Sequence, residues 1–230
     1  MVKIFCVNTQ TSKTFPEGTT LMDMLPSFEF ERPYPILCAK VNNVSQGLKY
    51  RAFNSRKVEF HDYTSYLGRS VYCNSLCFLL CKAAKDIFPG CRVILRRPIS
   101  KGYFCSIDKG DGAQISHGDL EQIKARMSEL VEADIPFRRH EVLVEEAIEL
   151  FRSLGYDDKV KLLETSGDVY VNYYTFDETP DYYYDALLSS PGNLKVWGLE
   201  MYRDGLLLRV PDRHKPEELA PFVEQPKTFD

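Results

Sequence analysis

Three cysteines are spaced for a metal site or for a cluster of reactive thiols. Cys73, Cys77 and Cys81 lie four residues apart in a segment with helical periodicity, so they span about 80° of one helix face. Leu76 and Leu80 share this sector. A structural zinc site needs four ligands, and neither a C-x2-C pair nor a nearby histidine supplies the rest. We predict that the thiols pack in a core, with metal binding and redox sensing as alternatives.

A second group of side chains suits an anion. The stretch CRVILRRPISK contains several basic residues and no acidic residue. Its basic residues are Arg92, Arg96, Arg97 and Lys101. Phosphate or an RNA backbone can bind to such cations, and a base can stack on the nearby Tyr103 or Phe104. The alternative is a strand face that is simply solvated.

The sequence contains no recognisable pattern for phosphoryl transfer or other catalysis. A P-loop needs G-x4-G-K-[ST], because its backbone amides and its lysine hold the phosphates while its hydroxyl reaches Mg²⁺. None of the 13 glycines is followed by lysine, and G-x-G-x-x-G is absent as well. We therefore predict no catalytic residue, no metal and no other cofactor in this chain.

The first part of the chain predicts a small sheet with one short helix. Thr19 or Thr20 can cap this helix, and Pro26 ends it. The stretch from 42 to 56 is polar and rich in turn residues. Strands on both sides of a helix within about 62 residues are typical of a β-grasp unit. Strand-like runs stand at residues 2–7, 36–43 and 58–62.

The rest of the chain predicts a larger α+β region. We expect a long helix from Thr64 to Pro89 and another helix from Ser116, whose spacing from Asp119 resembles a capping box. Four prolines in the last twenty residues indicate a tail or a linker. Further helices are expected at 145–155 and 159–165, and strands at 91–100, 101–108, 135–144, 168–176, 195–203 and 205–210.

The composition predicts a folded cytoplasmic protein. Hydrophobic residues make up 44% of the 230 residues, and the formal net charge of −4 argues against a surface covered in cations. No apolar run is long enough to span a membrane, and the N-terminus has no secretory pattern. All seven cysteines lie between Cys6 and Cys105. Their odd number favours reduced, buried thiols over a disulfide framework.

The order of these segments resembles the N-terminal half of threonyl-tRNA synthetases. The likeness runs from about Met1 to about Pro211 and is most specific between Gly102 and Glu164. The strings that carry it are KAAKDIFPG, GYFCSID, SHGDLEQIKARMSELVEADIPF and VEEAIELFRSLGYDDKVKLLE. The resemblance implies an α+β protein with a TGS-like β-grasp domain at 1–62, an editing-like domain at 63–212 and a tail or linker at 213–230.

The same pair of domains opens a group of bacterial uridine kinase-like proteins. In that group a P-loop nucleoside kinase follows the two domains. The chain is more similar to this group, because its long helix contains no histidine. The resemblance then implies that ATP and Mg²⁺ belong to a kinase domain outside this chain.

The editing site of the synthetases can be compared residue by residue. Editing enzymes carry His-x3-His on the long helix and a later Cys-x3-His, and these groups can bind a metal or act as acid and base. Asn74 and Phe78 stand at the two histidine positions, and the later pair falls at Leu187 and at Ser190 or Pro191. The four functional groups are therefore missing, and neither asparagine nor phenylalanine replaces an imidazole.

Other positions of this site are retained, which implies a pocket without its chemistry. Lys159 and Asp185 match a lysine and an aspartate of the family, and Lys85 lies between Asn74 and Phe78 around the helix. The predicted ligand pocket consists of Asn74, Phe78, Lys85, Phe104, Lys159, Asp185 and Ser190. The predicted phosphate or RNA contacts are Arg92, Arg96, Arg97 and Lys101.

The resulting interpretation is a non-catalytic module that binds a ligand or regulates a uridine kinase-like protein. An aminoacyl-tRNA editing hydrolase, a tRNA-binding module and a structural or dimerising unit are the alternatives. The expected partners are a nucleotide, a nucleoside or an RNA end, together with the chain's own C-terminal kinase domain. We expect no membrane partner, and the sequence leaves a homo-oligomer open.

Overall fold

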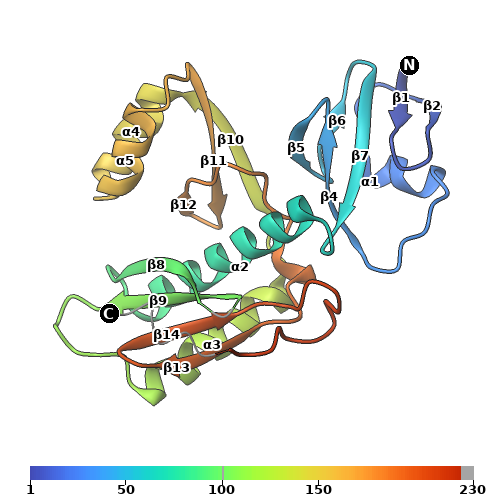
Figure 1. Ribbon diagram of the computed structural model, residues 1–230. Helices are drawn as coiled ribbons and strands as arrows, with labels where there is room; N and C mark the ends of the chain where they lie inside the picture. Colours follow the sequence, from blue (N-terminus) through green and yellow to red (C-terminus); the bar gives the residue numbers. More distant parts are fainter. Residues whose placement is uncertain (100, 224–230) are drawn as a thin grey trace. The chain divides into compact units, whose positions relative to one another are not determined.

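The chain forms two compact structural units, and the second is inserted in the sequence of the first. The computed structural model describes residues 1–99 and 101–223, and for residues 97–99 it describes the backbone alone. Unit 1 comprises Met1–Ile135 and Asp185–Asp230, and unit 2 comprises Pro136–Tyr184. In the described residues no helix is long and apolar enough to cross a membrane. Each unit has its own elements (Figure 1).

The N-terminal part of unit 1 is a mixed sheet with the strand order β2-β1-β7-β4-β5. β1 and β7 pair in parallel at its centre, and the other neighbours are antiparallel. This is the β-grasp arrangement, so the predicted fold class is confirmed. Its strands are β1 (Val2–Cys6), β2 (Thr11–Phe15), β4 (Ile36–Val41), β5 (Val44–Gly47) and β7 (Arg56–Asp62).

A short helix and a small ribbon complete the β-grasp part. The helix is α1 (Leu21–Met24), followed by the 3-10 turn η1 (Leu25–Ser27). Thr20 caps α1, because its Oγ1 accepts a hydrogen bond of 3.1 Å from the Asp23 amide. This confirms one of the two predicted caps. The ribbon pairs β3 (Thr19–Thr20) with β6 (Arg51–Ala52).

The predicted turn-rich stretch at 42–56 contains turns at 42–43 and 48–49, but the sequence missed the two short strands β5 and β6 that lie within it. Asn42 and Asn43 have φ values of 47° and 68°, which fit the tight hairpin turn that joins β4 to β5. β5 is an edge strand with one open side, and none of its residues is fully buried. A strand of this kind lacks the apolar alternation by which a sequence predicts it.

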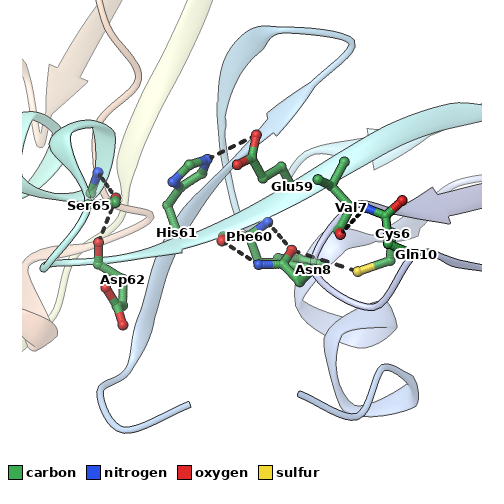
Figure 2. A network of polar contacts seen from close by, with 10 residues as sticks. Cys6, Val7, Asn8, Gln10, Glu59, Phe60, His61, Asp62 and Ser65 are labelled. Atoms are coloured by element: carbon green, nitrogen blue, oxygen red, sulfur yellow. Dashed lines mark hydrogen bonds and ion pairs between the residues drawn. The ribbon is translucent and has the colours of Figure 1, made fainter. Parts of the chain in front are cut away.

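The β-grasp sheet is joined to the long helix α2 (Tyr66–Ile87) by a short junction after β7. Ser65 caps the helix, since its Oγ accepts a 2.9 Å hydrogen bond from the Gly68 amide and donates one of 2.9 Å to the Asp62 carbonyl. Asn8, which follows β1, also bonds to β7. Its Oδ1 accepts a hydrogen bond from the Phe60 amide, and its Nδ2 donates one to the Phe60 carbonyl. Figure 2 shows these contacts at the end of β7. The start of α2 is therefore fixed by backbone that belongs to the sheet.

The remainder of unit 1 surrounds α2. An antiparallel sheet has the order β13-β14-β9-β8, and α2 contacts both β8 and α3. Ser116 and Asp119 form the predicted capping box at the start of α3. The seven cysteines are buried thiols outside any disulfide, as the sequence predicted. The elements are β8 (Arg92–Ile99), β9 (Gly102–Asp108), α3 (His117–Ala133), η2 (Pro191–Asn193), β13 (Gly198–Tyr202) and β14 (Gly205–Arg209).

Unit 2 is a sheet with two helices. Its strands β10 (Phe137–Leu143), β11 (Tyr170–Phe176) and β12 (Thr179–Asp181) are antiparallel. The helices α4 (Val144–Ser153) and α5 (Asp157–Glu164) contribute to a core with β11. The core residues are Ala147, Phe151, Val160, Leu163 and Val171.

Candidate ligand-binding site

Two hydroxyl groups on α2 hold the chain where it re-enters unit 1. Ser70 Oγ donates a 2.9 Å hydrogen bond to the Asp185 carboxylate. The buried Ser75 Oγ accepts one of 2.9 Å from the Leu188 amide and donates one of 2.7 Å to the carbonyl of Val71. The segment that follows Tyr184 is thus held against α2 beside Asn74 and Phe78, the two positions where the resemblance predicts the histidines of an editing enzyme.

Buried apolar side chains stand at two of the four positions that the resemblance predicts for the functional groups of an editing enzyme. Phe78 is 0% and Leu187 is 1% exposed, whereas Asn74 is half-buried. Ser190 is half-buried and precedes η2 without donating or accepting a cap bond, and Pro191 is buried. In residues 1–99 and 101–223 no group of histidine, cysteine and acidic residues is arranged to hold a metal. The residues at these positions offer neither an imidazole nor a thiolate.

Replacing Ser75 with alanine is expected to lower the free energy of unfolding of unit 1 by about 1–3 kcal/mol, because the buried Leu188 amide loses its acceptor. Urea unfolding followed by the fluorescence of Trp197, the single tryptophan, measures the change. Ser128→Ala is the matched control, since Ser128 bonds to its own helix at an exposed position. Equal stability of the Ser75 variant and the wild type would contradict this role.

The other residues of the predicted ligand pocket are Lys159, Phe104 and Lys85. Lys159 belongs to unit 2, where its Nζ lies 3.3 Å from the buried Asp181 carboxylate. Phe104 is 2% exposed and packs edge-on against Tyr202. Lys85 lies in the last turn of α2. The grouping of these side chains into one ligand pocket stays a prediction.

A cavity of about 540 Å³ lies beside the first two turns of α2. Its wall combines three segments of unit 1, namely α2, the turn from β8 into β9, and the chain after β14. The pairing of Leu208 with Tyr103 in the sheet brings the end of β14 next to the start of β9. The cavity is lined by Tyr66, Arg69, Ser70, Cys73, Lys101, Gly102, Tyr103, Val210, Pro211, Arg213 and His214.

The structure separates the basic residues that were predicted to contact phosphate or RNA. Arg92 and Arg96 are exposed on one face of β8, together with Ile94, and they do not line the cavity. Lys101 does line it, from the turn between β8 and β9. The side chain of Arg97 lies outside the described residues. The sequence analysis did not predict Arg69, Arg213 or His214 as binding residues, because Arg69 lies in a predicted helix and the other two lie in a predicted tail.

Cys73 lines the cavity but is not a reactive thiol. Burial raises the pKa of its thiol to about 11, and the nearby Tyr103 and Tyr63 hydroxyls offset only part of this rise. The pKa of the Tyr103 phenol is also raised, chiefly by burial. Both groups are therefore neutral near pH 7. The cavity can bind an anion through its cations without a nucleophile or a general base at these two positions.

Known proteins supply a comparison for this arrangement. The chain is 30% identical over 188 residues to a threonine–tRNA ligase of Syntrophotalea carbinolica. It is 28% identical over 188 residues to that of Symbiobacterium thermophilum and 27% over 175 residues to that of Azobacteroides pseudotrichonymphae. This chain is similar to part of threonine–tRNA ligases. No family model matches it.

The similarity to threonine–tRNA ligases covers most of this chain but a minor part of each relative. The matches include 76–81% of the chain and 27–29% of these ligases. The chain therefore spans less than a third of their length. The similarity agrees with an α+β arrangement of a TGS-like β-grasp domain followed by a threonine–tRNA ligase editing-like domain. None of these three relatives is named as a kinase.

Proposed function

We propose that this chain is a non-catalytic module that binds the 3′ end of a tRNA or a similar RNA. The observation that carries the proposal is that α2 holds the neighbouring segment in place although the predicted catalytic groups are absent. Ser70 and Ser75 hold the segment from Asp185 to Leu188 against α2, while Phe78 and Leu187 are buried apolar residues. The chain is similar to threonine–tRNA ligases, and the name of these enzymes states that they act on tRNA.

Hydrolysis of an aminoacyl ester needs a group that activates water or stabilises the developing charge. Asn74 and Phe78 carry no proton at neutral pH that such a step could exchange. Asp185 is the retained carboxylate near this face, and it accepts a hydrogen bond from Ser70. The proposed module therefore recognises an RNA end without cleaving the ester on it. We place it in the cytoplasm, where tRNA is charged.

The expected result is that the purified chain binds tRNA but does not speed the deacylation of aminoacyl-tRNA above the uncatalysed rate. Fluorescence anisotropy with labelled tRNA measures binding, and release of a labelled amino acid measures deacylation. Removing the terminal nucleotide of the tRNA is expected to weaken binding at least about tenfold, because each lost base contact is worth about 1–3 kcal/mol. Deacylation that disappears in Asp185→Ala would overturn the proposal, and so would equal affinity for full and shortened tRNA.

We further propose that the module serves a nucleoside kinase domain encoded after Asp230, as in uridine kinase-like proteins. The long helix without histidine supports this parent. ATP and Mg²⁺ would then bind to the kinase domain, and the module would bind its ligand or regulate that domain. Sequencing the gene downstream tests this, because a kinase parent requires G-x4-G-K-[ST] there. A downstream synthetase catalytic domain, or a stop codon directly after Asp230, would contradict it.

A further inference from the structure

The cavity beside α2 gathers positive charge from three segments that are far apart in the sequence. Arg69 comes from α2, Lys101 from the turn before β9 and Arg213 from the chain after β14. His214 also lines the cavity, and no lining residue among the described ones is acidic. Converging cations without a carboxylate in the wall are what an anionic ligand requires.

Two carboxylates whose partners include lining residues of the cavity are Asp212 and Asp185. Asp212 accepts hydrogen bonds from the backbone amides of His214 and Lys215, at 2.8 and 3.2 Å. Its carboxylate also lies 3.7 Å from Lys101 Nζ. The hydrogen bond from the His214 amide, together with that from the Lys215 amide and the charge of Lys101, lowers the pKa of the Asp212 carboxyl group. Asp185 accepts the hydrogen bond of Ser70.

The two arginines of the cavity have no carboxylate partner. In the part of the chain that the structure describes, neither Arg69 nor Arg213 forms an ion pair. A guanidinium group presents a planar set of donors that matches phosphate oxygens. Two such groups on opposite segments of one cavity therefore favour phosphate over a single carboxylate as the ligand group.

The cavity also offers aromatic rings. Tyr66 is 75% exposed at the start of α2, and Tyr103 is half-buried on β9. Bases stack on such rings without strong sequence preference. The volume of about 540 Å³ lies in the range of small-ligand sites. Phosphate-binding cations beside stacking rings are suited to a nucleotide.

The wall that carries Arg213 is held in place before any ligand binds. The Tyr63 hydroxyl donates a 2.9 Å hydrogen bond to the Pro211 carbonyl. The amides of Asp212 and Ala220 bond to the carbonyls of Glu218 and Val210, at 2.8 and 3.0 Å. The segment predicted as a tail thus begins with residues tied to unit 1. Such preorganisation reduces the entropy that binding would otherwise cost.

The cavity adjoins the face of α2 that carries Asn74 and Phe78, and Ser70 belongs to both. At about 100° per residue, Ser70, Tyr66 and Cys73 lie about 40°, 80° and 100° to one side of Asn74, and Phe78 lies about 40° to the other side. We propose that this cavity is a second binding site, which takes the phosphate group of a nucleotide and stacks its base on tyrosine. The phosphate can belong to a free mononucleotide or to the 5′ end of an RNA. This inference goes beyond the proposed function, which concerns the face of Asn74 and Phe78.

The test measures binding of uridine monophosphate, adenosine monophosphate, the two nucleosides and inorganic phosphate to the full chain by calorimetry. Each monophosphate is expected to bind at least about tenfold more tightly than its nucleoside. Arg69→Gln and Arg213→Gln are each expected to weaken monophosphate binding about tenfold or more, because each removes a charge-assisted bond. Arg92→Gln is the matched control, since Arg92 is exposed and lies outside the cavity.

Other arms identify the source of the phosphate and separate this site from the proposed function. A short RNA with a 5′ phosphate is compared with the same RNA carrying a 5′ hydroxyl. Tighter binding of the phosphorylated RNA, lost in Arg69→Gln, assigns the site to RNA ends. Binding of monophosphates alone assigns it to free nucleotides.

Unfolding curves that match the wild type exclude misfolding of a variant. Equal binding of nucleosides and monophosphates, no binding of any phosphate probe, or an equal loss in Arg92→Gln would overturn the inference. None of these results depends on recognition of a tRNA 3′ end.

Discussion

Replacing Phe78 with alanine is expected to lower the free energy of unfolding of unit 1 by about 3–5 kcal/mol. Phe78 is 0% exposed in the middle of α2, so its removal leaves a cavity that the helix and its neighbours fill only in part. The resemblance to editing enzymes predicts a histidine position here. Urea unfolding followed by Trp197 fluorescence measures the change.

The matched control is Phe53→Ala, because Phe53 is 62% exposed in the β-grasp part of the same unit. It is expected to cost less than about 1 kcal/mol. A loss of similar size in both variants would contradict a core role for Phe78. The same result would show Phe78 on an open surface, as a residue of an accessible ligand pocket.

Replacing Gly68 with alanine is expected to destabilise unit 1 by about 3 kcal/mol, at the upper end of the cost of overpacking. A methyl group at this position would lie 1.8 Å from the Asp62 carbonyl oxygen and 2.5 Å from its carbon. These are backbone atoms of the junction in Figure 2, which the cap bond of Ser65 holds in place. The methyl group therefore forces the start of α2 away from the end of β7.

Gly118→Ala is the matched control, since Gly118 also lies in the first turn of a serine-capped helix. The nearest atom to its added methyl group would be Ser116 Oγ at 3.7 Å, an ordinary contact. Alanine at this position is expected to leave stability unchanged or to raise it by up to about 1 kcal/mol. If Gly68→Ala proved as stable as Gly118→Ala, the close approach at the junction would be refuted.

Features that depend on neighbouring residues could be predicted from the sequence. The capping box of Ser116 and Asp119 and the cap by Thr20 each form within four positions of the chain. The burial of Cys73 and Cys77 followed from their place in an apolar helical stripe. The edge strand β5 was missed because its residues show no alternation of apolar and polar positions, which is the local signal of a strand.

The sequence by itself determined the α+β class, the caps of α1 and α3 and the absence of imidazole at Asn74 and Phe78. Only the tertiary structure showed that Arg69, Lys101 and Arg213 line one cavity. Helical periodicity and caps arise from contacts within a few residues, so the local sequence contains them. The cavity arises from the pairing of β14 with β9 and from the hydrogen bond between Tyr63 and Pro211. Such contacts join distant segments, and no local pattern specifies which single arginines they bring together.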